Sequence, residues 1–150
     1  MTTFDLDPRL AADSELLALI DDIEVRAMRR VPWPWLLLAP RVAGASELFD
    51  LDEAQRAALW QLTLELSEGL KRATAADKIN VGALGNVVAQ LHVHIIARHR
   101  TDPAWPAPVW GRSEVPLDEA ADAARRDTLC ALVDQISRSI PGRASEASQP

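Results

Sequence analysis

The sequence has a single cysteine, Cys130, among its 150 residues. One thiol excludes an intramolecular disulfide framework and a zinc site built from several cysteines, and it is typical of proteins in a reducing compartment. No apolar run approaches the roughly 18 residues that a membrane-spanning helix needs. The opening residues, MTTFDLDPRL, carry acids where a secretory signal requires a basic and then an apolar segment. We therefore expect a cytoplasmic protein.

Basic residues are also fewer than acidic residues. The chain has 16 Lys and Arg against 22 Asp and Glu, and a net charge of −6 argues against a general nucleic-acid binder. Hydrophobic residues make up 48% of the chain, which excludes a wholly disordered protein and is enough to fill one core at this length. We expect one domain over residues 1–140 and a disordered tail over residues 141–150.

The few basic residues are unevenly distributed. Residues 25–41 contain four arginines and no acid, and residues 78–112 contain four basic residues against Asp102 alone. Two basic segments in an acidic chain favour a local anionic ligand over a long polyanion. Ordinary solvated surface is the alternative interpretation of the same pattern.

Apolar spacing and turn residues predict the order of helices and strands. We expect helices over residues 10–23, 52–74 and 117–140, and strands over residues 25–28, 35–39, 78–83 and 91–97. The segment 101–116 holds four of the ten prolines and is expected to be irregular but packed. Because the strands occur in pairs close in sequence, the predicted class is α+β around an antiparallel sheet.

The residues that point to chemistry lie in the last predicted strand. Gln90, His92 and His94 alternate with apolar residues, so a strand projects all three to one face and its apolar residues to the other. Imidazole near neutral pH serves as nucleophile, proton carrier or hydrogen-bond donor to phosphate.

Three interpretations of this pattern are open. The histidines can belong to a strand with a polar, solvated face. A metal site built from His92, His94 and His99 is a second interpretation, although no cysteine or carboxylate lies beside them on the strand. Histidine chemistry at a phosphorus centre is the third, and the glycine-containing loop 82–86 and the basic segments favour it.

Three motifs in order resemble a known family. They are Gly-Asn-Val-Val-Ala-Gln-Leu-His-Val-His-Ile-Ile at 85–96, Pro-Trp-Leu-Leu-Leu-Ala-Pro-Arg at 34–41 and Asp-Pro-Ala-Trp-Pro-Ala-Pro-Val-Trp-Gly at 102–111. The first resembles the signature of the histidine triad (HIT) superfamily of nucleotide hydrolases and transferases. All three are similar to a bacterial, diadenosine tetraphosphate hydrolase-like branch with glutamine, here Gln90, at the first triad position. The resemblance covers roughly residues 4–112.

The resemblance implies a fold and a reaction. The HIT-like fold is an antiparallel sheet of about five strands with flanking helices, and its members commonly form homodimers. His92 falls on the nucleophile, which attacks the α-phosphorus of a nucleotide or dinucleoside polyphosphate and forms a covalent nucleotidyl-histidine that water then hydrolyses. His94 falls on the residue that donates to the phosphate oxygens, and Gln90 on the residue that orients the nucleophile. The family needs no metal or other cofactor for this reaction.

The expected substrate contacts lie around the same loop. Asn86 occupies a position where relatives have an amide that reaches the α-phosphate or the leaving group, and Asn80 is a further polar contact at the loop entrance. Gly85 lets the backbone approach phosphate closely because it has no side chain. Arg98, at the end of the predicted strand, is expected to face the phosphates.

Three residues depart from the family pattern. Gln90 cannot titrate as a histidine does, Val87 replaces a Ser or Thr that assists the leaving group, and Arg29 stands where relatives contact the ribose with Asn or Asp. A cation cannot accept a hydrogen bond from a hydroxyl. A non-catalytic nucleotide-binding or sensor protein is therefore kept as an alternative, together with a nucleoside phosphoramidase or nucleotidylyl transferase.

Overall fold

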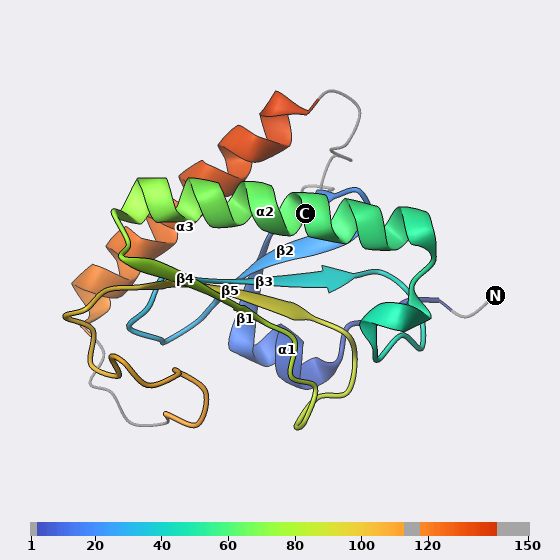
Figure 1. The fold of residues 1–150 in the computed structure, drawn as a ribbon, viewed down its shortest axis with the longest axis horizontal. Helices are drawn as coiled ribbons and strands as arrows, with labels where there is room; N and C mark the ends of the chain where they lie inside the picture. Colours follow the sequence, from blue (N-terminus) through green and yellow to red (C-terminus); the bar gives the residue numbers. More distant parts are fainter. Residues whose placement is uncertain (1–2, 113–117, 141–150) are drawn as a thin grey trace.

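The computed structural model describes residues 3–112 and 118–140, and it has an α+β fold built on a five-stranded antiparallel sheet (Figure 1). The strands follow the order β1-β2-β3-β5-β4 across the sheet. The elements are α1 (Pro8–Asp13), β1 (Ser14–Ile20), β2 (Ile23–Met28), β3 (Trp35–Pro40), the short 3-10 helix η1 (Leu48–Asp50), α2 (Glu53–Thr74), β4 (Lys78–Gly82), β5 (Val93–Arg98) and α3 (Glu119–Ser139).

The main core lies between one face of the sheet and the helices α2 and α3 (Figure 1). The α2 helix begins at the N-cap Asp52, whose side chain accepts from the Gln55 backbone N–H, and it buries a stripe of leucines at helical spacing. Every second residue of β3 and β5, including Leu36 and Ile95, faces these helices. The other face of β3 and β5 is therefore left for a different set of side chains.

That second face carries α1 and an aromatic cluster. Leu10 of α1 packs against Leu37 and Ala39 of β3, while Trp33 and Trp35 pack with Ile96 in a separate cluster. His94 lies on the same face, because it pairs with Leu37 in the antiparallel register. The two faces thus divide the molecule into a helix-covered core and a face that holds the histidines.

The helix expected over residues 10–23 is wrong. The α1 helix ends at Asp13, and residues 14–20 form the edge strand β1, which pairs with β2. A two-residue hairpin turn joins these strands, since Asp21 and Asp22 both have left-handed backbone φ angles of 50° and 60°. This geometry matches the twist of antiparallel strands, and it lets the backbone of residues 14–20 bond to β2 instead of closing helical turns.

The other predicted elements are confirmed to within a few residues, and so is the antiparallel α+β class. One boundary matters for the site: β5 begins at Val93, so His92 lies in the preceding loop, not in the strand. The expected tail, residues 141–150, lies outside the described residues. Within the described ranges, no helix is long and apolar enough to cross a membrane.

The backbone conformation of Ala75, the C-cap of α2, predicts that glycine at this position would stabilise the protein. Its backbone is left-handed, with φ 50° and ψ 38°, a conformation that places Cβ close to the following carbonyl oxygen. Ala75→Gly should therefore raise the free energy of unfolding by about 0.5–1 kcal/mol. Ala73→Gly, in the exposed last turn of the same helix, should lower it by about 1 kcal/mol. Urea denaturation measures both, and a loss of stability in Ala75→Gly would contradict the argument.

Candidate functional site

The two histidines lie at the start of β5, His94 within the strand and His92 in the loop just before it. β5 lies between β3 and β4, and His94 pairs with Leu37 on one side and with Gly82 on the other. His92 and His94 are each only 6% exposed. The interpretation of these histidines as a solvated polar face is therefore wrong. Their imidazole centroids lie 4.8 Å apart, with the ring planes at 77°.

A backbone carbonyl fixes the tautomer of His92. Its Nδ1 lies 2.6 Å from the carbonyl oxygen of Gln90, which can only accept a hydrogen bond. The proton of the neutral ring is therefore on Nδ1, and Nε2 carries the lone pair. A neutral nitrogen with a free lone pair is the form in which an imidazole acts as a nucleophile.

An indole fixes His94 in the opposite tautomer. The Nε1–H of Trp35 donates to Nδ1 of His94 at 2.9 Å, so the proton of His94 is on Nε2. Burial, followed by the proximity of His92, lowers the pKa of His94 to about 4. His94 is therefore a neutral hydrogen-bond donor at pH 7, next to the His92 ring.

A second tryptophan closes the site on this face. The ring centroid of Trp110 lies 5.6 Å from that of His94 and 6.2 Å from that of Trp35, both edge-to-face. A Cβ on Gly82 would lie 3.2 Å from the Trp110 ring, so the glycine leaves room for it. The proline-containing segment after β5 thus contributes a wall of the histidine site.

Gln90 has a different partner from the one expected. Its Oε1 accepts from the Asp7 backbone N–H at 2.8 Å, and its Nε2 donates to the Asp5 carbonyl at 2.8 Å. The side chain therefore joins the segment before α1 to the loop that carries His92, and it is the backbone carbonyl of Gln90 that orients His92.

The loop before β5 forms one side of a cleft of about 270 Å³. Gly85, with a left-handed φ of +74°, Gln90 and His92 line this cleft. The exposed side chains of Phe49 and Leu84 line it as well, so the cleft combines apolar and polar walls. Asn86 is exposed on the same loop.

Arg98 and Asn80 bind each other and do not line this cleft. Arg98 is only 1% exposed, and its guanidinium makes four hydrogen bonds: two to Asp102, at 2.7 and 3.1 Å, one to Asn80 Oδ1 and one to the Ala107 carbonyl. Burial alone would raise the pKa of Asp102, but these bonds and backbone N–H groups hold it well below its usual range. Arg98 thus anchors the segment that carries Trp110.

His99 is separated from the other two histidines. Its Nε2 lies 2.9 Å from the carbonyl of Thr74, at the end of α2. In residues 3–112 and 118–140, no group of three or more His, Cys, Asp or Glu side chains is arranged to hold a metal ion.

Sequence reasoning found the histidine pair but missed three residues that hold it. Trp35 lies in the motif at 34–41, and its N–H bond to His94 depends on the pairing of β3 with β5, which residue types do not reveal. Trp110 and Asp102 were recognised as part of a motif, without a link to His94 or Arg98. The local signal that could have indicated the ion pair is the position of Asp102, four residues after Arg98 at the end of β5.

The low pKa of His94 predicts a loss of stability in acid. In the unfolded chain this residue protonates near its ordinary pKa of 6.5, whereas the folded protein resists protonation until about pH 4. The contribution of His94 to the free energy of unfolding should therefore be fully present above pH 6.5. It should decrease as the pH falls toward 4, by about 2 kcal/mol between pH 7 and 5. Urea denaturation at several pH values measures this, and His94→Gln should flatten the dependence. An NMR titration of the His94 Hε1 proton with a midpoint near 6.5 would contradict it.

Comparisons with known proteins agree with this geometry. Residues 11–101 match the family model of the HIT domain. A histidine triad protein from Marinobacter aquaeolei VT8 is 42% identical, with 89% of this chain and 98% of that chain covered and a TM-score of 0.81. A histidine triad protein from Bradyrhizobium japonicum is 40% identical, with 90% of this chain and 99% of that chain covered and a TM-score of 0.83. One from Sinorhizobium meliloti 1021 is 43% identical, with 90% of this chain and 98% of that chain covered and a TM-score of 0.79. A search of the curated proteins found no match. The chain belongs to the HIT domain family.

Proposed function

We propose that the protein is a nucleotide hydrolase that cleaves dinucleoside polyphosphates, of the diadenosine tetraphosphate kind, at the α-phosphorus. The observation that carries the proposal is the pair of opposite tautomers: His92 has its lone pair on Nε2, and His94 has its proton on Nε2. A nucleophile and a hydrogen-bond donor are thus fixed beside each other before any substrate binds.

The reaction has two steps in this proposal. Nε2 of His92 attacks the α-phosphorus, and the bond to the bridging oxygen breaks with its electron pair leaving on the departing polyphosphate. A water molecule then attacks the same phosphorus and releases one proton to the solvent, the P–N bond breaks with its electron pair returning to Nε2 of His92, and the nucleoside monophosphate departs. A neutral nitrogen avoids the repulsion that an anionic nucleophile meets at a phosphate. The Nε2–H of His94 stabilises the charge on the phosphoryl oxygens in both steps.

The loop before β5 supplies the proposed substrate contacts. The backbone at Gly85 and the exposed amide of Asn86 approach the phosphates, and Gly85 and His92 line the same cleft. Arg98 and Asn80 are left out of this set because the Arg98 network engages them. Arg9 lies nearby, since its Nη1 donates to the Val87 carbonyl at 2.9 Å and its side chain is 59% exposed, with its charge paired to Asp7 at 3.1 Å.

Gln90 acts in this proposal as a positioning residue. Its side chain ties the backbone of Asp5 and Asp7 to the loop of His92, and the bond from Arg9 to Val87 strengthens the same contact. The amide thereby restrains the carbonyl that sets the His92 tautomer.

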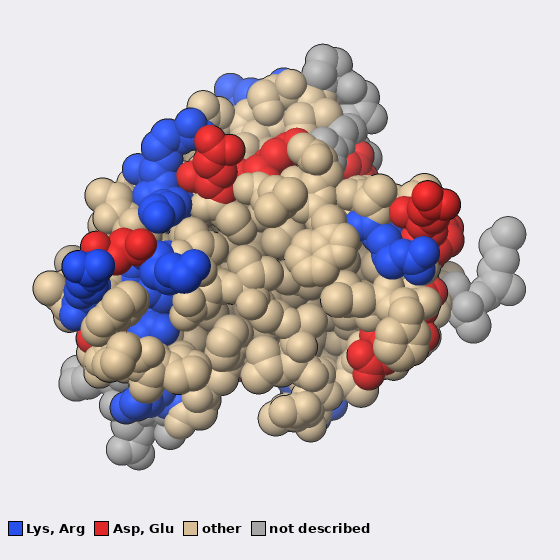
Figure 2. Space-filling model, in the orientation of Figure 1, with Lys and Arg blue, Asp and Glu red and all other residues tan. Residues whose placement is uncertain are grey.

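A non-catalytic nucleotide-binding protein is the second candidate. The side chain of Gln90 is engaged by the N-terminal segment, and Val87, 78% exposed, offers no hydroxyl to the leaving group. A phosphoramidase or nucleotidylyl transferase would use the same histidines and differ in leaving group or acceptor. A homodimer and a cytoplasmic location stay predictions. The edge strand β4, with Val81 43% exposed, and the exposed Trp60 and Leu64 of α2 favour a dimer through that side. The centre of the face seen in Figure 2 is largely uncharged.

Replacement of His92 tests the reaction. Wild-type protein should convert diadenosine tetraphosphate to mononucleotide products, measured by anion-exchange chromatography, and His92→Asn should lower kcat by about 10³-fold or more. His99→Asn is the matched control, because that histidine bonds to Thr74 outside the site, and it should retain activity.

Two outcomes would decide against hydrolysis. Saturable nucleotide binding by the wild type without turnover, across a panel of dinucleoside polyphosphates, would indicate the non-catalytic candidate. Turnover that survives His92→Asn would exclude the covalent intermediate. Intact-protein mass spectrometry of rapidly quenched wild type should show an added nucleotidyl group that is absent from His92→Asn.

Replacement of Gln90 tests its positioning role. Gln90→Ala removes the acceptor of the Asp7 N–H, so hydrogen exchange at that amide should become at least about tenfold faster. The variant should lower kcat by a smaller factor than His92→Asn and leave the pH midpoint of activity unchanged, since an amide does not titrate. Gln61→Ala, at an exposed position of α2, is the control and should change neither quantity. A loss of activity without faster exchange would contradict positioning through the N-terminal segment.

A further inference from the structure

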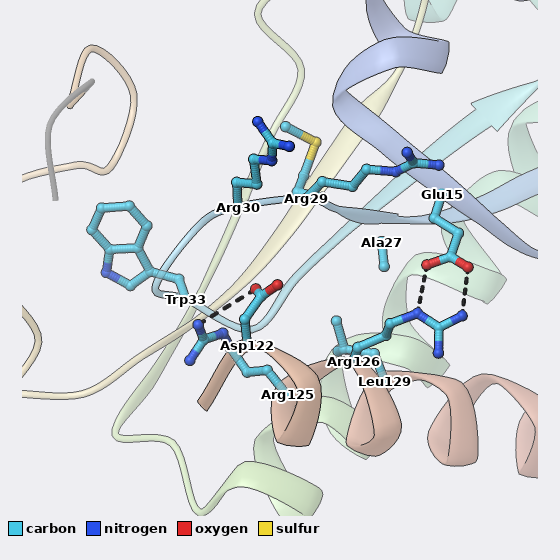
Figure 3. A pocket seen from close by; sticks show the side chains of 10 residues that line it. Glu15, Ala27, Arg29, Arg30, Trp33, Asp122, Arg125, Arg126 and Leu129 are labelled. Atoms are coloured by element: carbon cyan, nitrogen blue, oxygen red, sulfur yellow. Dashed lines mark hydrogen bonds and ion pairs between the residues drawn. The ribbon is translucent and has the colours of Figure 1, made fainter. Parts of the chain in front are cut away.

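A pocket of about 360 Å³ lies on the helix-covered side of the sheet, between the edge strands and the first half of α3 (Figure 3). Ala27 and Leu129 in its lining belong to the main core, whereas His94 faces the opposite side of the sheet. Trp33, which also lines the pocket, packs against Trp35 in the aromatic cluster of the histidine face. Four arginines, Arg29, Arg30, Arg125 and Arg126, line the pocket together with two carboxylates.

The two carboxylates are already paired with α3. Glu15 of β1 binds Arg126 through both oxygens, with the Nε bond at 2.7 Å, and Asp122 lies 3.6 Å from Arg125 (Figure 3). The hydrogen bonds from Arg126 keep the pKa of Glu15 below its ordinary value, so it stays charged and paired. These pairs leave two positive charges in the lining.

Arg29 and Arg30 carry that remaining charge. Within residues 3–112 and 118–140, neither has a carboxylate within ion-pair distance. The other arginines of the basic segment 25–41 are neutralised, since Arg26 binds Glu24 at 2.7 Å and Arg41 lies 3.6 Å from Asp22. The excess charge of that segment is thus concentrated at this pocket, which shares no lining residue with the cleft beside His92.

The backbone holds these two arginines in place. Arg30 has a left-handed φ of 55°, which costs free energy in a residue with a side chain. The Arg29 N–H donates to the Asp13 carbonyl at 2.9 Å and anchors the turn to the end of α1. The backbone thus places adjacent arginines at one rim of the pocket, while both side chains are exposed and their guanidinium groups extend in different directions (Figure 3).

We propose that this pocket binds a small organic phosphate monoester, with the phosphate on Arg29 and Arg30. A phosphate dianion matches the excess charge of the lining, and guanidinium groups bind phosphate oxygens in pairs. Ala27, Leu129 and Trp33 form an apolar wall for the organic part of the ligand. The volume is at the lower end of the range of small-molecule pockets. The inference is independent of the proposed hydrolase activity.

Backbone amide NMR with titrated ligand tests the proposal. The probes are glycerol 3-phosphate and inorganic phosphate, added to wild type, to the double variant Arg29→Gln/Arg30→Gln and to His92→Asn. Lys71→Gln/Arg72→Gln at the end of α2 is the matched control, since it removes the same charge from two adjacent basic residues elsewhere. Thermal denaturation of each variant shows that it remains folded.

The expected shifts lie at residues 27–33 and in the first half of α3, with glycerol 3-phosphate bound more tightly than inorganic phosphate. Affinity should fall about tenfold or more in Arg29→Gln/Arg30→Gln and be unchanged in His92→Asn and in the control. Three results would overturn the proposal: shifts confined to the loop before β5, equal weakening by both double variants, or no saturable binding in the millimolar range.

Discussion

The hydrogen bond from the Trp35 indole to Nδ1 of His94 is the interaction on which the site depends. It assigns the tautomer of His94, and burial of the same ring keeps that ring neutral. The bond is available only because β3 and β5 are neighbours in antiparallel register, so sheet topology, not the histidine motif alone, determines what His94 can donate. His92 takes the opposite tautomer from a carbonyl two residues earlier, and the pair becomes an acceptor beside a donor.

Two further restraints hold this pair from opposite sides. Gln90 ties the loop of His92 to the segment before α1, and Arg98 ties the strand of His94 to the segment that brings Trp110 onto its ring. Both restraints use buried or partly buried polar side chains whose partners lie far away or in irregular segments. The positions of the two imidazole rings therefore depend on the N-terminal segment, on β3 and β5, and on the segment after β5.

Sequence patterns predicted most of this fold. Apolar spacing and turn residues predicted the helix over 52–74 and the strand over 35–39, which are α2 and β3 in the structure. The pattern failed at residues 14–20, where leucines at mixed spacing suited a helix, because the outcome depended on an Asp21–Asp22 turn that pairs the chain with β2. At the site, residue types identified His92 and His94. They could not predict the role of Arg98, whose partners come from β4 and from the segment after β5.

The Arg98 network also limits how the sequence can change over evolutionary time. Its guanidinium reaches Asn80 of β4 and, in the segment after β5, Asp102 and the Ala107 carbonyl. A lysine at this position has too few directed N–H groups to replace all of these bonds, and a neutral residue would leave the Asp102 carboxylate buried without its cation. A protein with a substitution at only one of Arg98 and Asp102 is therefore expected to be less stable than one that keeps both. Descendants of this protein are expected to keep both residues or to lose them together with the folded segment that carries Trp110.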